Sequence, residues 1–322
     1  MAIEQPSYWV LAAGWFLILS KGRQGAWAEM LKQASNESMR VRVTTWTNAL
    51  GYGCSMSLPF LMGSLIDFGM LSWKTVACVA GASLVVAGCL QTLLPSVRAT
   101  IIQPSRPPLK QAWNALQAVP MFRHYQMAQM AAGAGLMIIQ PAIPRLLVHD
   151  FGLGYADCAL LFGVCKAVGY VISSRAWSHL FPKLGVICVS ALASSLALLF
   201  VFLLGIATQP TAVAFAYLLY GSMQAGSELT WQMSPIHFSQ TQSSLPFSGA
   251  ATFLMGLRGC LVPALGAWLL AQGALQAPLQ VGLLFSLIGC SGFWLLVRLQ
   301  GRQASHSPNC GSLSSQGSLS QP

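Results

Sequence analysis

Long apolar runs dominate this sequence and limit the folds that it can adopt. A run of about 20 apolar residues crosses the ~30 Å hydrocarbon core of a bilayer as an α-helix. The bilayer offers no water to unpaired backbone groups, so such segments must be helical or form a closed barrel. We therefore expect an all-α polytopic membrane protein with about nine transmembrane helices: Tyr8–Ala28, Thr45–Ile66, Thr75–Leu94, Tyr125–Leu147, Cys158–Ser174, Leu184–Ile206, Ala212–Trp231, Phe247–Leu270 and Leu279–Val297.

The scarcity of charged residues supports this interpretation. Only 7% of the residues are charged and 55% are hydrophobic, whereas a soluble domain has about 25% charged residues. The net charge of +10 would indicate nucleic-acid binding in a soluble protein. Here the basic residues mostly lie between the apolar runs, as cytoplasmic loop charges do. We therefore expect the lipid bilayer as the partner and no nucleic acid.

The distribution of these basic residues orients the chain. Basic residues follow the first span (Lys32, Arg40, Arg42), the third (Arg98, Arg106, Lys110), the fifth (Arg175, Lys183) and the ninth (Arg298, Arg302). The loop after the seventh span, Gln232–Pro246, has none. Because cytoplasmic loops carry an excess of Lys and Arg, we expect the odd-numbered loops and the C-terminus in the cytoplasm and the N-terminus outside. The protein would then be a multi-pass protein of the plasma membrane or of a bacterial inner membrane.

Composition also divides the chain into segments. A polar stretch with four prolines, residues 95–118, separates the first three spans, in residues 1–94, from the last six, in residues 119–298. Residues 299–322 are rich in Ser, Gln and Gly. Because such a composition buries little apolar area, we expect this tail to be disordered.

Two parts of the chain align without a gap. Trp27 and Trp231 each end a span, and Pro59 and Pro263 each lie in the following span; both pairs are 204 residues apart. Six spans with short loops need about 200 residues, so the spacing predicts a repeat unit of six helices, as in many transporters. Spans four to nine then form one complete unit, and spans one to three form the last half of another.

The motifs near the second repeat carry a family resemblance. The segments 231–238 (WQMSPIHF), 248–249 (SG), 256–259 (GLRG) and 263–266 (PALG) resemble helices ten to eleven of a major facilitator superfamily transporter. Residues 95–118 resemble the central cytoplasmic linker of that family. The resemblance covers Tyr8 to Val297 and implies a twelve-helix fold that lacks its first three helices here. Residues 1–94 would be a partial N-terminal half and residues 119–298 a complete C-terminal six-helix half.

The resemblance leads to two functional hypotheses. The first is secondary active transport of a small solute by alternating access, with or without a coupling ion. The second is a truncated homologue that is inactive alone or depends on a separate chain for the missing helices. The sequence matches no hydrolase, kinase or dinucleotide-binding motif, and its nine cysteines form no C-x-x-C pair. We therefore expect no enzyme, no cofactor and no metal site.

Ionisable residues inside the apolar runs are the candidates for a substrate or ion pathway, because each costs roughly 2.5–3.5 kcal/mol on insertion. Arg258 lies between Gly256 and Gly259 in the eighth span. It would bind an anion or a substrate carboxylate, or else pair with a helix C-terminus or with Glu228. Lys166 lies in the middle of the fifth span and should face the bundle interior, on the pathway or as a structural counter-ion.

Glu228 and His237 are weaker candidates. Glu228 is either a proton carrier or an interfacial carboxylate, and the second interpretation is favoured because the predicted loop begins one turn later. His237 lies in that loop, where it would serve as a gating residue or, more simply, as a solvated histidine. Pro59, Pro141, Pro144 and Pro263 are expected to break or kink their helices.

Overall fold

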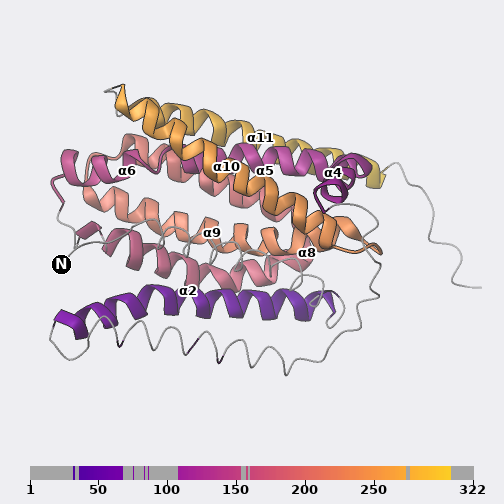
Figure 1. Cartoon of the computed structure of the whole chain (residues 1–322), viewed down its shortest axis with the longest axis horizontal. Helices are drawn as coiled ribbons and strands as arrows, with labels where there is room; N and C mark the ends of the chain where they lie inside the picture. Colours follow the sequence, from indigo (N-terminus) through magenta and orange to yellow (C-terminus); the bar gives the residue numbers. More distant parts are fainter. Residues whose placement is uncertain are drawn as a thin grey trace, which may run out of the picture.

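The computed structural model describes residues 32, 36–67, 75, 83, 86, 108–153, 157–158, 160–272 and 276–305. These residues are helical apart from short turns, and no strand occurs among them, which confirms the all-α prediction for this part of the chain. Figure 1 shows the elements: α2 (Glu37–Asp67), α4 (Pro108–Ala118), α5 (Pro120–Ile138), α6 (Ala142–Arg145), the π-helical turns η1 (Leu146–Asp150) and η2 (Leu160–Cys165), α8 (Lys166–Ile206), α9 (Pro210–Ser239), α10 (Leu245–Ala271) and α11 (Gln276–Ser305).

Four segments of the described chain are long and apolar enough to cross a membrane: Pro120–Asp150, Leu160–Ile206, Leu245–Ala271 and Gln276–Arg302. They make the chain compatible with a multi-pass membrane protein. The predicted span Tyr8–Ala28, which contains Trp27 of the predicted repeat, and most of Thr75–Leu94 lie outside the described residues. Helix α2 contains the predicted span Thr45–Ile66 but is not one of the four apolar segments.

The longest of these segments, Leu160–Ile206, is a helical hairpin. At Gly185 the backbone has φ 73° and ψ 173°, a conformation that residues with a Cβ rarely adopt. Phe162 and Phe200 both pack against Tyr217, with ring centroids 5.1 and 5.6 Å from that ring. The limbs on either side of Gly185 therefore run in opposite directions. Each limb has roughly 20–25 residues, enough to cross the hydrocarbon core once.

The hairpin corrects a predicted boundary. Span Cys158–Ser174 was expected to end before a loop with Arg175 and Lys183, but α8 continues through both residues to the reversal at Gly185. A hydropathy pattern ends at the first charged residues, whereas a helix can project beyond the hydrocarbon core. The predicted loop therefore shrinks to a tight turn.

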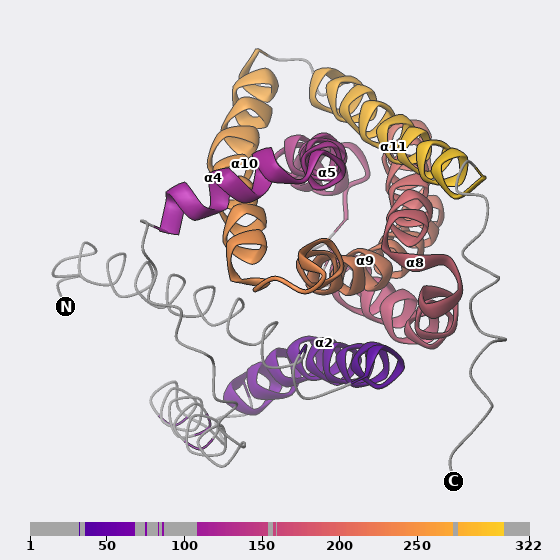
Figure 2. The same cartoon turned by 90° about the vertical axis from the view of Figure 1, so that its right-hand side faces the viewer.

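Helix α9 lies inside the bundle although it is not among the four apolar segments. Viewed along the bundle, α5, α10, α9, α8 and α11 form a ring, and α2 lies outside this ring against α8 and α9 (Figure 2). Buried residues occur along α9 from Val213 to Ser239. The predicted loop Gln232–Pro246 is thus helical up to Ser239, because polar residues on a buried helix lower its hydropathy without ending it.

Buried apolar side chains form one cluster at each end of the bundle. The first joins the start of α5, the Gly185 turn, the end of α9 and the start of α10, through Phe122, Phe181, Phe238 and Phe247. The second joins the end of α5, the start of η2, the end of α8 and the start of α9, through Ile138, Leu161, Leu204 and Val213. Helices α5 and α9 therefore extend the full length of the bundle.

The end that holds the first cluster, called the basic end here, collects positive residues that were predicted to share one side. Lys110 lies on α4, whose Ala112 belongs to that cluster. Lys183 precedes the Gly185 turn, and Arg298 follows Leu296 of the same cluster. Lys32 donates a hydrogen bond of 2.8 Å to Ser239 Oγ at the end of α9. Segments from the predicted loops after spans one, three, five and nine thus meet at one end.

The helices pack closely where glycines face a neighbour. A Cβ at Gly169 would overlap the backbone of Leu218, and a Cβ at Gly221 would overlap the backbone of Lys166. These two glycines bring α8 and α9 into backbone contact. Gly135 and Gly282 do the same for α5 and α11. Small residues at such contacts are typical of helix packing in membranes.

The predictions for the prolines and for the polar segments agree with the structure only in part. Pro141 separates α5 from α6, as expected of a residue without a backbone N–H, whereas α10 continues through Pro263. Within the predicted linker, residues 108–118 form α4. The prediction of disorder was wrong for residues 299–305, which complete α11; residues 306–322 lie outside the described part of the chain.

Candidate functional site

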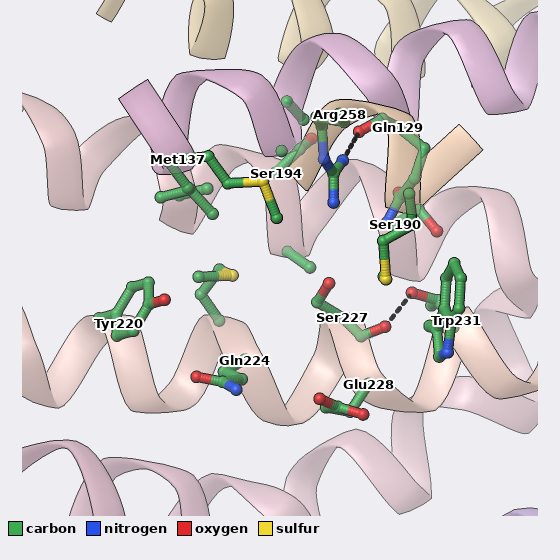
Figure 3. Close-up of a pocket in the computed structure, with 18 of the residues that line it drawn as sticks. Gln129, Met137, Ser190, Ser194, Tyr220, Gln224, Ser227, Glu228, Trp231 and Arg258 are labelled. Atoms are coloured by element: carbon green, nitrogen blue, oxygen red, sulfur yellow. Dashed lines mark hydrogen bonds between the residues drawn. The ribbon is translucent and has the colours of Figure 1, made fainter. Parts of the chain in front are cut away.

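A cavity of about 580 Å³ lies between α5, the second limb of α8, α9 and α10. We call it the Arg258 cavity. Figure 3 shows Arg258 and Gln129 on one side of the space and Gln224, Ser227 and Glu228 on the other. Its wall is unusually polar for the interior of an apolar bundle, with side chains from all four helices: Gln129, Gln140, Ser190, Ser194, Gln224, Ser227, Glu228, Thr230 and Arg258.

Helical spacing explains why these residues converge. On α9, Tyr220, Gln224, Ser227 and Trp231 recur every three or four residues, so they share one face. On α5 the same spacing joins Gln129 to Gly133 and Met137, and Gln140 follows in the turn after the helix. The signal was present in the sequence as polar residues at helical spacing within apolar runs. It is weak because uncharged polar residues at this spacing also occur on ordinary helices, whereas a charge in an apolar run stands out.

Arg258 is the most buried charged residue of this wall, with 6% of its surface exposed. Its Nη1 donates a hydrogen bond of 2.7 Å to the backbone carbonyl of Gln129 on α5. Its Nε is buried and has no hydrogen-bond partner among the described residues. The sequence left open whether Arg258 faces a cavity or pairs with a helix end or with Glu228. The structure places it in the cavity wall, held by the middle of α5.

Gly133 makes room for this arginine. A Cβ at residue 133 would overlap the Arg258 guanidinium, so only glycine allows the side chain to pass α5 in its present position. The guanidinium and the Gln129 carbonyl meet because Gly133 is one helical turn from Gln129. Gly133 was not among the predicted site residues, since its role depends on the contact between two helices.

Glu228 lies farther from the end of its helix than predicted. Helix α9 continues to Ser239, about three turns beyond Glu228, and Glu228 lines the Arg258 cavity. The predicted loop does not begin one turn after Glu228, because α9 continues through the polar residues. The interfacial position of this carboxylate in a membrane stays a prediction. The Glu228 carboxylate is also close enough to act electrostatically on Lys166, Tyr170 and Tyr220.

Lys166 does not line the Arg258 cavity. Its ammonium lies over two aromatic rings, with Nζ 4.7 Å from the Tyr220 centroid and 5.6 Å from the Tyr52 centroid. Tyr52 belongs to α2 and stacks on Tyr170 with a centroid distance of 4.0 Å. Lys166 therefore links α2 to the ring of helices. It also lines a second cavity of about 410 Å³, called the Lys166 chamber here.

His237 lies in the last turn of α9, not in a loop as predicted. Its ring contacts Phe238 edge to face at 5.1 Å. It lines a third cavity, of about 380 Å³, at the basic end together with Lys32 and Arg40. The structure thus separates the four predicted residues: Arg258 and Glu228 share one cavity, while Lys166 and His237 each line another.

Comparison of the chain with protein-family models and with curated proteins gave no match. Among the described residues, no three His, Cys, Asp or Glu side chains are grouped so that they could hold a metal ion.

Proposed function

We propose that this protein transports a small polar solute across the membrane and that the Arg258 cavity is its binding site. The observation that carries the proposal is a polar cavity with a buried arginine inside a bundle of membrane-length helices. Burying a charge in such a bundle costs free energy, so a buried charge there indicates a functional role. Solute-binding sites of secondary transporters lie between helices near the middle of the membrane, and the Arg258 cavity also lies between helices.

Arg258 favours an anionic solute. One N–H is already used by the Gln129 carbonyl, which fixes the direction of the guanidinium. The buried Nε–H has no partner, and the planar guanidinium suits a carboxylate, to which it donates two parallel hydrogen bonds. Across the cavity, Gln224 Oε1 is also buried without a partner. It would accept a hydrogen bond from a hydroxyl or amine of the same solute once the neighbouring side chains shift to expose it.

Glu228 and Lys166 are proposed as parts of an ion pathway beside this site. Glu228 lines the cavity and acts on Lys166, so protonation of its carboxylate would change the charge that both the solute and Lys166 experience. This arrangement suits a proton as the coupling ion. The major facilitator architecture suggested by the sequence motifs supports alternating access as the mechanism.

The second hypothesis, a homologue that depends on a separate chain, is favoured by a different observation. Every residue that lines the Arg258 cavity lies between Gln129 and Phe293, that is, within the predicted C-terminal half. A cavity between two halves would have walls from both. The alternative is therefore that this chain binds the solute but transports it only with additional helices.

Uptake into liposomes tests these proposals. The purified chain is reconstituted, and uptake of radiolabelled lactate, succinate and glutamate is measured separately, with and without an inward proton gradient. We expect at least one carboxylate to accumulate, and Arg258→Met to abolish uptake while the exposed control Arg298→Met retains it. If none of the three carboxylates is taken up but at least one binds at equilibrium, the partner-dependent alternative is favoured. If none is taken up and none binds, the proposed site is rejected.

The orientation is a separate proposal. We infer that the basic end faces the cytoplasm, because positive residues from four predicted loops meet there and cytoplasmic loops are enriched in Lys and Arg. The C-terminus, which follows α11 at that end, would then be cytoplasmic. Protease treatment of sealed vesicles with a C-terminal epitope tests this: the tag should be protected in right-side-out vesicles and cleaved in inverted ones.

A further inference from the structure

The Lys166 chamber adjoins the Arg258 cavity on the side away from the basic end. The two spaces share Gln140 and Tyr220 in their walls. The remaining wall of the chamber is largely aromatic, with Phe162, Phe200 and Tyr217. Phe200 and Tyr217 belong to the buried cluster at the opposite end of the bundle, which places the chamber between the Arg258 cavity and that end.

Tyr217 lines this chamber, and its hydroxyl is a hydrogen-bonding group that the described residues leave unused. The residue is 2% exposed, and its hydroxyl is buried without a hydrogen-bond partner among the described residues. Its ring is fixed by edge-to-face contacts with Phe162 and Phe200. A buried hydroxyl without a partner costs free energy, and nearly all such groups in proteins are paired. The hydroxyl has almost no accessible surface in the ligand-free structure, so a ligand in the chamber would supply the missing partner once the neighbouring side chains shift to expose it.

Lys166 brings a positive charge to the same space. The faces of Tyr52 and Tyr220 stabilise its ammonium, but ring faces leave its three strong N–H donors without a conventional acceptor. The described residues form no hydrogen bond with this ammonium in the structure. Glu228 acts on it electrostatically but lines the neighbouring cavity, not the chamber. The chamber itself thus contains a positive charge and no negative one from the described residues.

We propose that the Lys166 chamber binds a small carboxylate with an aromatic body. The ammonium of Lys166 faces the carboxylate, the Tyr217 hydroxyl donates a hydrogen bond to it, and the rings of Phe162 and Phe200 contact the body of the ligand. A volume of about 410 Å³ accommodates a single ring with a short side group. This site is distinct from the Arg258 cavity, and its occupation does not depend on transport.

The positive charge of Lys166 favours an anion over a cation as the ligand of the chamber. Aromatic walls also bind organic cations, but here Lys166 already covers the face of Tyr220. A second cation in the chamber would lie close to that ammonium in a medium of low dielectric constant, where like charges repel strongly. An anion is attracted by the Lys166 ammonium and compensates for the water that this ammonium lacks inside the bundle.

Equilibrium binding of radiolabelled benzoate to the purified full chain tests the proposal. We expect saturable binding that benzyl alcohol and benzylammonium do not displace at equal concentration. Lys166→Met should weaken benzoate binding roughly tenfold or more, because hydrogen bonds to charged groups are the strong ones. The control Lys183→Met, an exposed lysine beside the Gly185 turn, should leave the affinity unchanged.

Tyr217→Phe separates a binding role from a structural one. It removes only the unpaired oxygen, so the ligand-free chain should unfold at an equal or higher temperature, while benzoate affinity falls roughly three- to tenfold. Absence of benzoate binding, unchanged affinity in both variants, or stronger binding of benzylammonium would overturn the proposal. So would a loss that follows Arg258→Met instead of Lys166→Met, which would place benzoate in the Arg258 cavity. Uptake by this protein has no bearing on these outcomes.

Discussion

The Arg258 cavity and the Lys166 chamber hold their positive charges in different ways. Arg258 is fixed in direction by a hydrogen bond to the Gln129 carbonyl, whereas Lys166 is stabilised by the faces of two rings. A hydrogen bond orients a planar guanidinium, but a ring face attracts any cation at a suitable distance. If both proposed sites bind ligands, the first arrangement would select ligand geometry and the second mainly charge.

One helix builds the two different walls. Tyr217 and Tyr220 of α9 line the chamber. Tyr220 also lines the cavity, together with the polar residues that follow it: Gln224, Ser227, Glu228 and Thr230. The wall of α9 changes from aromatic to mainly polar near Gly221, where α9 touches the backbone of Lys166. The close approach of α8 and α9 thus sets Lys166 at the boundary between the two spaces.

Arg258→Lys should have the largest effect on this comparison. A lysine keeps the charge but cannot bond the Gln129 carbonyl and present a planar pair of donors at once. We expect the affinity for a transported carboxylate to fall about 30- to 100-fold, or roughly 2–3 kcal/mol, measured as equilibrium binding. Arg298→Lys serves as the exposed control. If Arg258→Lys binds like the native chain, only charge matters in the cavity and the contrast with Lys166 disappears.

Gly221→Ala should affect both spaces together. The added Cβ would overlap the backbone of Lys166, which cannot move aside as a flexible side chain can. We expect a loss of about 1–3 kcal/mol in the free energy of unfolding, measured by thermal or denaturant unfolding in detergent. Gly249→Ala is the matched control, because its Cβ would meet nothing within 4 Å. Equal stability of the two variants would show that α8 and α9 are not held by this contact.

The sequence predicted the helical class, the α10 span and the shared end of the basic loops, because these depend on local hydropathy and charge. Phe247–Leu270 differs from the observed Leu245–Ala271 by only a few residues. Boundaries failed where polar residues lie on helices that continue: Arg175 and Lys183 on α8, and His237 on α9. The hydropathy of a residue indicates whether it favours water or lipid, not whether its backbone is helical.

The residues that line the two spaces were predicted only in part. Arg258, Glu228 and Lys166 were candidates because a charge in an apolar run is visible in the sequence, and each lines a cavity. Their separation into two spaces was not predicted, because it depends on the hairpin at Gly185 and on the contact of α8 with α9. Uncharged wall residues such as Gln224 and Tyr217 resemble ordinary helix residues until the fold places them around a cavity.

Gly133→Ala tests whether the direction of Arg258 matters while its chemistry is kept. The Cβ would displace the guanidinium, which is the flexible end of a side chain, so we expect little change in unfolding temperature. Carboxylate binding at the Arg258 cavity should fall about tenfold, comparable to the loss of one charge-assisted hydrogen bond. Gly256→Ala, on the same helix as Arg258 and with nothing within 4 Å of its Cβ, should bind normally. Normal binding by Gly133→Ala would mean that the position of the guanidinium is not critical.

Lys166→Arg should have the smallest effect, and it is the counterpart of Arg258→Lys. A guanidinium also lies favourably on an aromatic face, so Arg at position 166 would keep its charge over Tyr220 and remain near the carboxylate. We expect benzoate affinity to stay within about threefold of the native value, less than 0.7 kcal/mol. Lys166→Met, which loses the charge, provides the lower reference. A loss in Lys166→Arg as large as that in Lys166→Met would show that the chamber, like the Arg258 cavity, depends on the geometry of its cation. Charge alone would then not distinguish the two sites.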